Sequence, residues 1–197
     1  AGYCDLVPEL LDEFGNNWGG RWPDAKPYTD YKKMLGEADL DIITVGTGDD
    51  KHADIVVDAA NGGVKAVMCE KPLATSMEDA NRMLEACEDN GVPISVGHTR
   101  AWDPTLNKVR TMVRNGDIGP VGSITANMGG ARAMMFRNGT HDLHAVVFVA
   151  DSEPTHVIGL LEGGFDHWDR YRGDGGKKPE AEPAVSGIIR FANGARA

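Results

Sequence analysis

The sequence predicts an α/β fold: a partial doubly wound parallel sheet, followed by an α+β region with a mostly antiparallel sheet. One observation is that residues 41–45 form a continuous β-branched run, as in a strand buried on both faces. A second is that helical patterns alternate with such segments as far as residue 96. A third is that apolar positions alternate after Gly97, which is typical of half-exposed strands.

The composition argues against some classes of function. The chain has 197 residues, 41% of them apolar, and a formal net charge of −10. A sizeable core is therefore expected, and disorder is not. An acidic chain lacks the basic face that phosphate contacts need, so we expect neither nucleic acid nor a membrane surface as partner. No run of 18 apolar residues predicts a transmembrane helix, and no signal peptide is visible.

The cysteines bear on the compartment. Cys4, Cys69 and Cys87 are odd in number and match no CxxC or zinc spacing. Such thiols persist in a reducing environment, so a cytoplasmic location is favoured.

The first elements are short. We expect a strand over 1–5 and then a helix that Pro8 opens, where the missing N–H of proline loses no hydrogen bond. Residues 16–27 are rich in Gly, Asn, Trp and Pro, so they are expected to form a loop. Asp30 is a candidate N-cap for a helix over 31–38.

A βαβ unit follows. The strand over 41–45 leads into the turn 46–50, and a helix begins near His52 and stops at Gly62-Gly63. The next strand covers 64–69. This order implies parallel pairing and a right-handed crossover.

Another helix and strand extend the sheet. Thr75-Ser76-Met77-Glu78 has the pattern of a capping box, and Asn90-Gly91 ends the helix. The strand over 92–96 follows. The positions expected on the buried helix face step by three, four and three: Met77, Ala80, Leu84 and Cys87.

The second half has a different pattern. Asp103 and Pro104 begin a helix that runs through Arg114. The polar stretch 163–183 is expected to be a mobile loop, whose residues 166–172 contact substrate, an oligomer partner or only solvent. The other expected elements are a strand over 123–128, a helix over 141–150, strands over 155–161 and 184–191, and a hairpin turn at Asn193-Gly194.

Five motifs stand in a specific order along the chain. They are Gly46-Thr47-Gly48-Asp49-Asp50-Lys51-His52, Cys69-Glu70-Lys71-Pro72-Leu73-Ala74, Gly97-His98-Thr99-Arg100-Ala101-Trp102-Asp103-Pro104, Gly116-Asp117-Ile118-Gly119 and Asn138-Gly139-Thr140-His141-Asp142. In combination they resemble the Gfo/Idh/MocA oxidoreductases, over nearly the whole chain. The resemblance implies an NAD(P)-dependent enzyme with a Rossmann domain, here 1–98, and a substrate and oligomerisation domain, here 99–197.

The resemblance implies two catalytic residues. Lys71 meets the substrate oxygen and stabilises negative charge there, and His141 exchanges the hydroxyl proton. A histidine suits this role because its ordinary pKa of about 6.5 lies near working pH. The residues alone leave simpler readings open. Glu70-Lys71 is compatible with a surface ion pair, and a histidine at a helix start is often a cap or a packed residue.

The resemblance also implies a set of cofactor-binding residues. Asp5 accepts from the adenosine ribose hydroxyls, which favours NAD, although NADP is possible. Taken alone, Asp5 is equally a helix cap, 46–48 an ordinary turn and His52 a helix-start residue. The full implied set is Asp5, Gly46, Thr47, Gly48, Asp49, His52, Glu70, Lys71, Pro72 and Arg100.

The implied substrate site departs from the family pattern at one position. Arg137 stands where the family often has an aspartate, four residues before the histidine, so the catalytic trio of the polyol dehydrogenases is incomplete. His141 and His144 have a metal-compatible spacing, but two ligands are too few, and we expect no metal. The implied substrate contacts are Lys71, Trp102, Arg137, Asn138, His141 and His144.

A second departure concerns the ends of the chain. The family opens with a strand and a Gly-x-Gly-x-x-Gly turn that cradles the pyrophosphate, and the sequence contains no such turn. We therefore expect the chain to be truncated at both ends, to bind dinucleotide poorly by itself and to be inactive alone.

The function expected from the resemblance is hydride transfer between a nicotinamide cofactor and a sugar, polyol or related hydroxy compound. Two alternatives stay open: a non-catalytic dinucleotide- or sugar-binding regulator, and an NAD-dependent, redox-assisted glycoside hydrolase. Function belongs to the site, so the fold does not separate them. The expected partners are a small-molecule substrate and a second copy bound through the C-terminal sheet.

Overall fold

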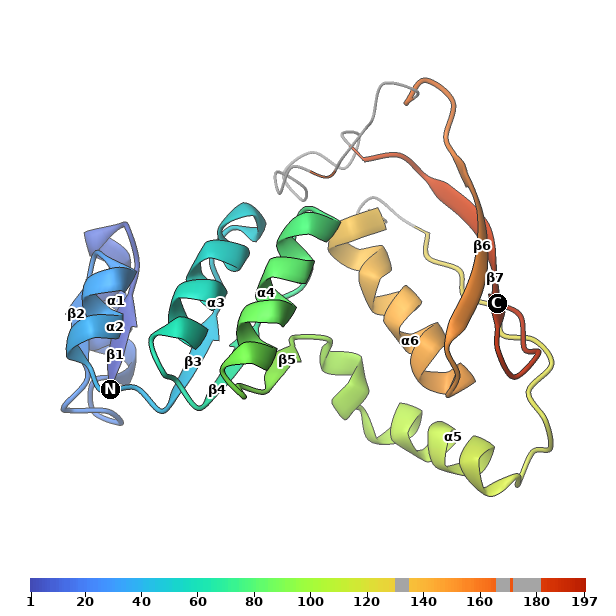
Figure 1. Cartoon of the computed structure of the whole chain (residues 1–197), viewed down its shortest axis with the longest axis horizontal. Helices are drawn as coiled ribbons and strands as arrows, with labels where there is room; N and C mark the ends of the chain where they lie inside the picture. The colour runs from blue at the N-terminus through green and yellow to red at the C-terminus, as the bar shows by residue number, and fades with distance from the viewer. Residues whose placement is uncertain (130–134, 166–170, 172–181) are drawn as a thin grey trace. The chain divides into compact units, whose positions relative to one another are not determined.

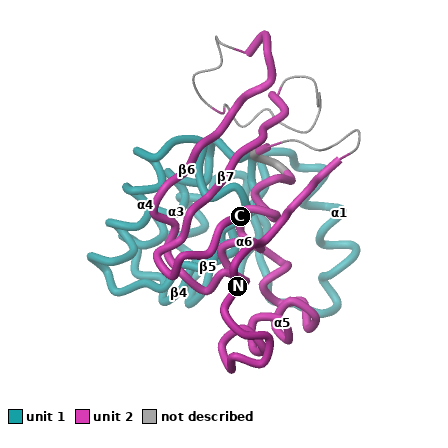
Figure 2. Tube along the Cα trace, turned by 90° about the vertical axis from the view of Figure 1, so that its right-hand side faces the viewer, with its two compact units in different colours: residues 1–96 teal, residues 97–197 magenta. Residues whose placement is uncertain are grey.

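The structure is a computed structural model that describes residues 1–129, 135–165, 171 and 182–197, except the side chains of Phe136 and Arg137. The chain divides into two compact units, Ala1–Val96 and Gly97–Ala197 (Figure 2). The predicted fold class is confirmed, because the first unit has parallel strands with helices and the second has an antiparallel pair with helices. The functional assignment of the domains 1–98 and 99–197 stays a prediction.

The first unit contains two groups of parallel strands (Figure 1). Strands β1 (Gly2–Cys4) and β2 (Lys26–Tyr28) form one pair. Strands β3 (Ile42–Val45), β4 (Ala66–Cys69) and β5 (Ile94–Val96) form the other sheet. The helices are α1 (Pro8–Trp18), α2 (Tyr31–Glu37), the 3-10 turn η1 (Asp49–Lys51), α3 (His52–Asn61) and α4 (Met77–Asp89).

The prediction that 16–27 is a loop is wrong at both of its ends. Helix α1 continues to Trp18, whose ring lies 6.0 Å from that of Trp22. The segment then ends in β2, which pairs with β1 in parallel. Proline is tolerated at an edge strand because its missing N–H can face away from the ladder, so Pro27 does not prevent this pairing.

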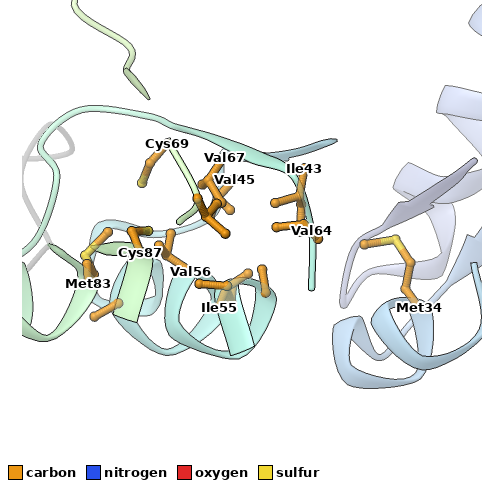
Figure 3. Packing of buried hydrophobic residues seen from close by; sticks show 14 of the residues in the cluster. Met34, Ile43, Val45, Ile55, Val56, Val64, Val67, Cys69, Met83 and Cys87 are labelled. Atoms are coloured by element: carbon orange, nitrogen blue, oxygen red, sulfur yellow. The ribbon is translucent and has the colours of Figure 1, made fainter. Parts of the chain in front are cut away.

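The expectation that β3 is buried on both faces is also wrong for the described residues. Ile43 and Val45 are 5% and 2% exposed, whereas Ile42 is 65% exposed. Helices α3 and α4 lie side by side on one face of the sheet (Figure 1). The buried side chains therefore point to that face alone, where Val56 and Met83 are fully buried among them (Figure 3).

Helix α4 begins one residue later than its predicted capping box. Ser76 is the N-cap, and its hydroxyl oxygen accepts from the Asp79 N–H at 3.1 Å. The predicted buried face is right at Cys87, which is buried, and wrong at Leu84, which is 40% exposed, whereas Met83 is fully buried. Met77, at the exposed first turn, is 75% exposed.

The second unit contains the remaining elements. Strands β6 (Pro154–Leu161) and β7 (Val185–Phe191) pair antiparallel, as predicted. The Asn193-Gly194 turn is confirmed, because Gly194 has φ of 88° and the Phe191 N–H bonds to the Ala195 carbonyl at 3.0 Å. The helices are the 3-10 turn η2 (Thr99–Trp102), α5 (Pro104–Asn115), the π-helical turn η3 (Met135–Gly139) and α6 (Thr140–Ala150).

The predicted strand over 123–128 is not formed. In the described part of this segment only Ser123 makes a bridge, to Arg196. The alternating pattern allows a strand, but a ladder also needs a partner along its length. Here the partner backbone runs beside only the start of the segment, with the Ile124 N–H donating to the Arg196 carbonyl at 2.8 Å.

Charged side chains join α5 to α6. The carboxylate of Asp151 accepts from Arg110 and Arg114 at distances between 2.7 and 3.1 Å. Asp151 ends α6 in the left-handed region, with φ of 46°. Within the described ranges, no helix has both the length and the apolar character needed to cross a membrane.

Candidate functional site

The strand register of the first unit brings two of the predicted motifs to one edge. Val45 pairs with Cys69, so Gly46 and Glu70 follow on neighbouring parallel strands, and the Glu70 N–H donates to the Val45 carbonyl at 2.8 Å. The carboxyl ends of parallel strands are where ligands bind in open α/β sheets. This edge is therefore the candidate cofactor site.

The turn after β3 is open to solvent. Gly46, Thr47 and Gly48 are exposed, and Asp49 begins η1. A Cβ added at Gly46 would lie 3.9 Å from the nearest atom, the Glu70 Cγ. Ordinary packing would therefore admit a larger residue at Gly46, and the open side of the turn leaves room for a close ligand.

Asp5 follows β1 and is half-buried. Its Oδ1 accepts from the N–H of Val7, the N-cap residue of α1, at 2.9 Å, and the helix itself has no side-chain cap. A carboxylate has two oxygens with several lone pairs. The single bond to Val7 is therefore compatible with the ribose contact that the resemblance implies.

The segment after β4 is half-buried and turns sharply. The Lys71 N–H donates to Glu70 Oε2 at 3.1 Å, so the glutamate folds back on the backbone. Pro72 is buried, and the Lys71–Pro72 peptide bond is cis. The hydrogen bond between the Lys71 N–H and the Glu70 carboxylate holds the backbone beside the side chain of Lys71, the predicted catalytic lysine.

His52 begins α3, as predicted, but the sequence did not indicate the burial and the contacts of its ring. Its side chain is 0% exposed, and it lies between the two turns of the candidate site. Nδ1 is 3.0 Å from the Pro72 carbonyl oxygen and Nε2 is 3.2 Å from the Thr47 carbonyl oxygen. No sequence signal could have shown these contacts, because both partners are backbone atoms.

A cluster of three histidines marks the second unit. The rings of His98 and His144 are stacked with centroids 4.5 Å apart, and His98 meets His141 edge-on at 5.8 Å. His98 Nε2 also lies 2.9 Å from the Thr140 hydroxyl, next to His141 in the chain. The start of α6 thus positions His141 beside two further imidazoles, and His98 was not among the predicted site residues.

His144 lies in an apolar and cationic setting. Burial, and then the positive charge of Arg110, lower the pKa of this histidine below its ordinary value. Its ring packs 5.7 Å from Phe148, over which the Arg110 guanidinium stacks at 4.2 Å. Among the described residues, its buried Nδ1 has no hydrogen-bond partner. A neutral imidazole is therefore favoured at this position.

Other predicted residues of this unit lie nearer to solvent. Arg100 forms an ion pair with Asp142, a residue that directly follows His141 in the Asn-Gly-Thr-His-Asp motif but was not assigned a role. Trp102 is 74% exposed. Asp103 caps α5, because its Oδ1 accepts from the Thr105 and Leu106 N–H groups.

The remaining predicted substrate contacts are Asn138, Arg137 and the loop residues 166–172. Asn138 is half-buried in η3, just before α6. The side chain of Arg137 lies outside the described residues, as do 166–170 and Arg172 of the predicted loop contact. The described ranges contain no group of three His, Cys, Asp or Glu side chains arranged to hold a metal ion.

Comparison with known proteins bears on both units. Residues 16–98 match the model of an oxidoreductase family with an NAD-binding Rossmann fold. A D-apiose dehydrogenase from Paraburkholderia graminis is 35% identical over 116 residues, which are 59% of this chain and 30% of that protein. An inositol 2-dehydrogenase from Salmonella paratyphi B is 33% identical over 121 residues, 59% of this chain and 34% of that protein.

Solved structures extend the likeness to the whole chain. The myo-inositol 2-dehydrogenase from Lactobacillus plantarum matches with a TM-score of 0.75 at 20% identity, over 100% of this chain and 60% of that one. At this identity the match shows the fold alone. The resemblance to the Gfo/Idh/MocA oxidoreductases is confirmed. The matches cover about a third of the two curated relatives, so the activity of a whole protein does not follow from them.

NAD is the cofactor expected of the matched family. The first unit fits part of such a ligand. The carboxylate of Asp5 follows β1, which pairs with β2, and the open turn at Gly46 and the lysine at Lys71 follow the parallel strands β3 and β4 of the other sheet. The sequence contains no Gly-x-Gly-x-x-Gly turn, the motif that would contact the pyrophosphate of the cofactor. The described residues therefore suit the ribose and nicotinamide portions.

Proposed function

We propose that this chain supplies most of the site of an NAD-dependent oxidoreductase that transfers a hydride between the cofactor and a sugar, polyol or related hydroxy compound. The observation that carries the proposal is the strand register that sets Gly46 beside Glu70-Lys71 at the carboxyl edge of the sheet. The similarity to dehydrogenases named for apiose and inositol supports a polyhydroxylated substrate. NAD is favoured over NADP because a carboxylate at Asp5 repels a 2′-phosphate.

The chain's own residues have distinct tasks in this reaction. Asp5 and the Gly46–Gly48 backbone hold the cofactor, which when bound accepts a hydride from the alcohol carbon. Lys71 stabilises the negative charge that develops on the substrate oxygen. His141 takes the hydroxyl proton, as a general base within hydrogen-bond reach of that hydroxyl can do.

The surroundings of His141 suit a polar substrate. His144 is favoured as the neutral ring, since burial and Arg110 oppose its charging. A neutral imidazole both donates and accepts, as a sugar hydroxyl does. Asn138 offers an amide from the turn before α6. The Arg137 guanidinium, in place of a carboxylate, would favour a substrate that carries an anionic group.

We also propose self-association through β6 and β7, in a reducing cytoplasm. Val157, Ile158 and Leu160 are 68%, 69% and 71% exposed. Successive residues of a strand point to opposite faces, so the strand pair presents apolar side chains on both. Cys4, Cys69 and Cys87 are free thiols, which agrees with a reducing compartment.

The test uses the gene product that contains this chain, incubated with NAD and a panel of sugars, polyols, their acid derivatives and glycosides. Appearance of NADH absorbance with at least one compound is the expected result. Dinucleotide binding without turnover of any compound would contradict the proposal and favour a regulator. Release of sugar from a glycoside without net NADH would instead favour the redox-assisted hydrolase.

A further inference from the structure

His52 is the most completely enclosed polar side chain of the first unit. It is the first residue of α3 and is 0% exposed. Its ring contacts the Thr47 carbonyl, five residues earlier, and the Pro72 carbonyl, twenty residues later. The two carbonyls belong to the two turns that form the candidate cofactor site, so one side chain connects turns from two different strands.

The chemistry of the contacts requires the ring to donate. A carbonyl oxygen only accepts, so each short contact is a hydrogen bond when the facing nitrogen carries a proton. A neutral imidazole carries one N–H and the protonated ring carries two. In either state at least one turn is tied to α3, and at Pro72, where the contact is buried, loss of the donor would leave the carbonyl poorly satisfied.

The enclosure also excludes a different role. A side chain with no exposed surface cannot touch a ligand that enters from the strand edge, so direct cofactor contact by this ring does not fit the structure. Gly46, Thr47 and Gly48 are exposed and Lys71 is half-buried. These are the groups that His52 can influence, through the backbone of Thr47 and of Pro72.

We propose that His52 is a positioning residue that fastens the 46–49 turn to the 70–72 turn and so fixes the separation between the glycine backbone and Lys71. This contact is independent of any ligand. Its consequence for cofactor binding and for Lys71 rests on the proposed function.

The test is amide hydrogen exchange of the 197-residue chain, read at three amides of the two turns. The Lys51 N–H bonds to the Gly48 carbonyl, the Glu70 N–H to the Val45 carbonyl and the Lys71 N–H to Glu70 Oε2. The Ala38 N–H, bonded to the Met34 carbonyl at the end of α2, is the reference. In His52→Phe, which keeps a ring but no donor, exchange at the amides of at least one of the two turns should rise about tenfold, the effect of one lost buried hydrogen bond.

Two further variants separate the two contacts. The amide nitrogen of asparagine corresponds to Nδ1, so His52→Asn should keep Glu70 and Lys71 protected and release Lys51. The amide nitrogen of glutamine corresponds to Nε2, so His52→Gln should do the reverse. The matched control is His156→Phe on the exposed strand β6, where exchange at these amides should not change.

The outcomes decide the proposal without any enzyme assay. Unchanged exchange in His52→Phe, or an equal rise at Ala38, would show a core-packing residue and overturn it. Identical patterns in the asparagine and glutamine variants would also overturn it. A calorimetric titration with NAD of the gene product that contains this chain separates this result from the proposed function. Local exchange changes without NAD binding by that gene product leave the positioning role of His52 in place and remove its consequence for the cofactor.

Discussion

The two units hold their chemical groups by different means. In the first, the described residues form a core of fifteen buried side chains, and the turns of the candidate site follow directly from strands of that core. In the second, the described buried cluster has four members: Val146, Ala150, Phe191 and Ala195. The histidine cluster there is accompanied by polar contacts instead, such as His98 with Thr140 and Arg100 with Asp142. We infer that the turns of the first unit are positioned mainly by packing, and the histidine cluster of the second unit mainly by charge and hydrogen bonding.

The largest effect should come from the core of the first unit. Met83→Ala removes a fully buried side chain and leaves a cavity, so we expect the free energy of unfolding to fall by about 2–5 kcal/mol. Urea denaturation followed by tryptophan fluorescence measures this change. Leu84→Ala, one residue along and 40% exposed, is the control and should cost much less. Equal losses in the two variants would mean that the phase of α4 is wrong.

A smaller effect is expected from the charged contacts of the second unit. Asp151→Asn removes the charge that binds Arg110 and Arg114, while asparagine still tolerates the left-handed backbone at this position. We expect a modest loss of stability, because these groups are partly exposed and their attraction is screened. The loss should shrink in 1 M salt, whereas the loss in Met83→Ala should not. A salt-independent loss would contradict an electrostatic role.

The same group predicts a pH dependence. Donation by Arg114 and then Arg110 lowers the pKa of Asp151 to about 2. Because the folded pKa is below the ordinary value near 3.9, the stabilisation is present above pH 4 and is lost as the pH falls toward 2. Acid titration of the unaltered chain and of Asp151→Asn should therefore converge at low pH. Curves that stay parallel to pH 2 would show that the carboxylate is not stabilising.

The smallest effect concerns one imidazole. Replacing Arg110 with methionine removes a positive charge near His144, so the pKa of that histidine should rise while remaining below its ordinary value, since burial is the larger cause. Nuclear magnetic resonance titration of the labelled ring measures the shift. His156, on exposed β6, is the internal reference and should not respond. A fall in the pKa of His144 would contradict the proposed effect of the Arg110 charge on this ring.

Sequence reasoning succeeded where local pattern and tertiary packing agree. The β3–α3–β4 unit followed from β-branched runs and glycine stops, and the N-cap roles of Asp30 and Asp103 followed from their positions. The pattern failed at the start of α4. The predicted capping box begins at Thr75, whereas Ser76 is the N-cap, and Met83 is buried where Leu84 was expected.

Other features had no local signal. Strand β2 contains Pro27, and only its pairing with β1 reveals it. The partners of His52 are carbonyl oxygens of Thr47 and Pro72, which every residue type possesses. Contacts of this kind depend on which backbone atoms the fold brings together, so sequence patterns do not predict them. The motifs after β3 and β4 indicated which edge of the sheet forms the candidate site, but they did not indicate that the ring of His52 contacts both turns there.

Lys71 provides the most direct test of the proposed reaction. In the gene product that contains this chain, Lys71→Met should lower kcat/KM for NAD reduction with the best substrate about 100-fold or more, as expected when a group that stabilises developing charge is lost. Lys65→Met, which removes an exposed lysine paired with Asp41 at the start of the same strand region, is the matched control and should retain the rate. An unchanged rate in Lys71→Met would contradict the central claim.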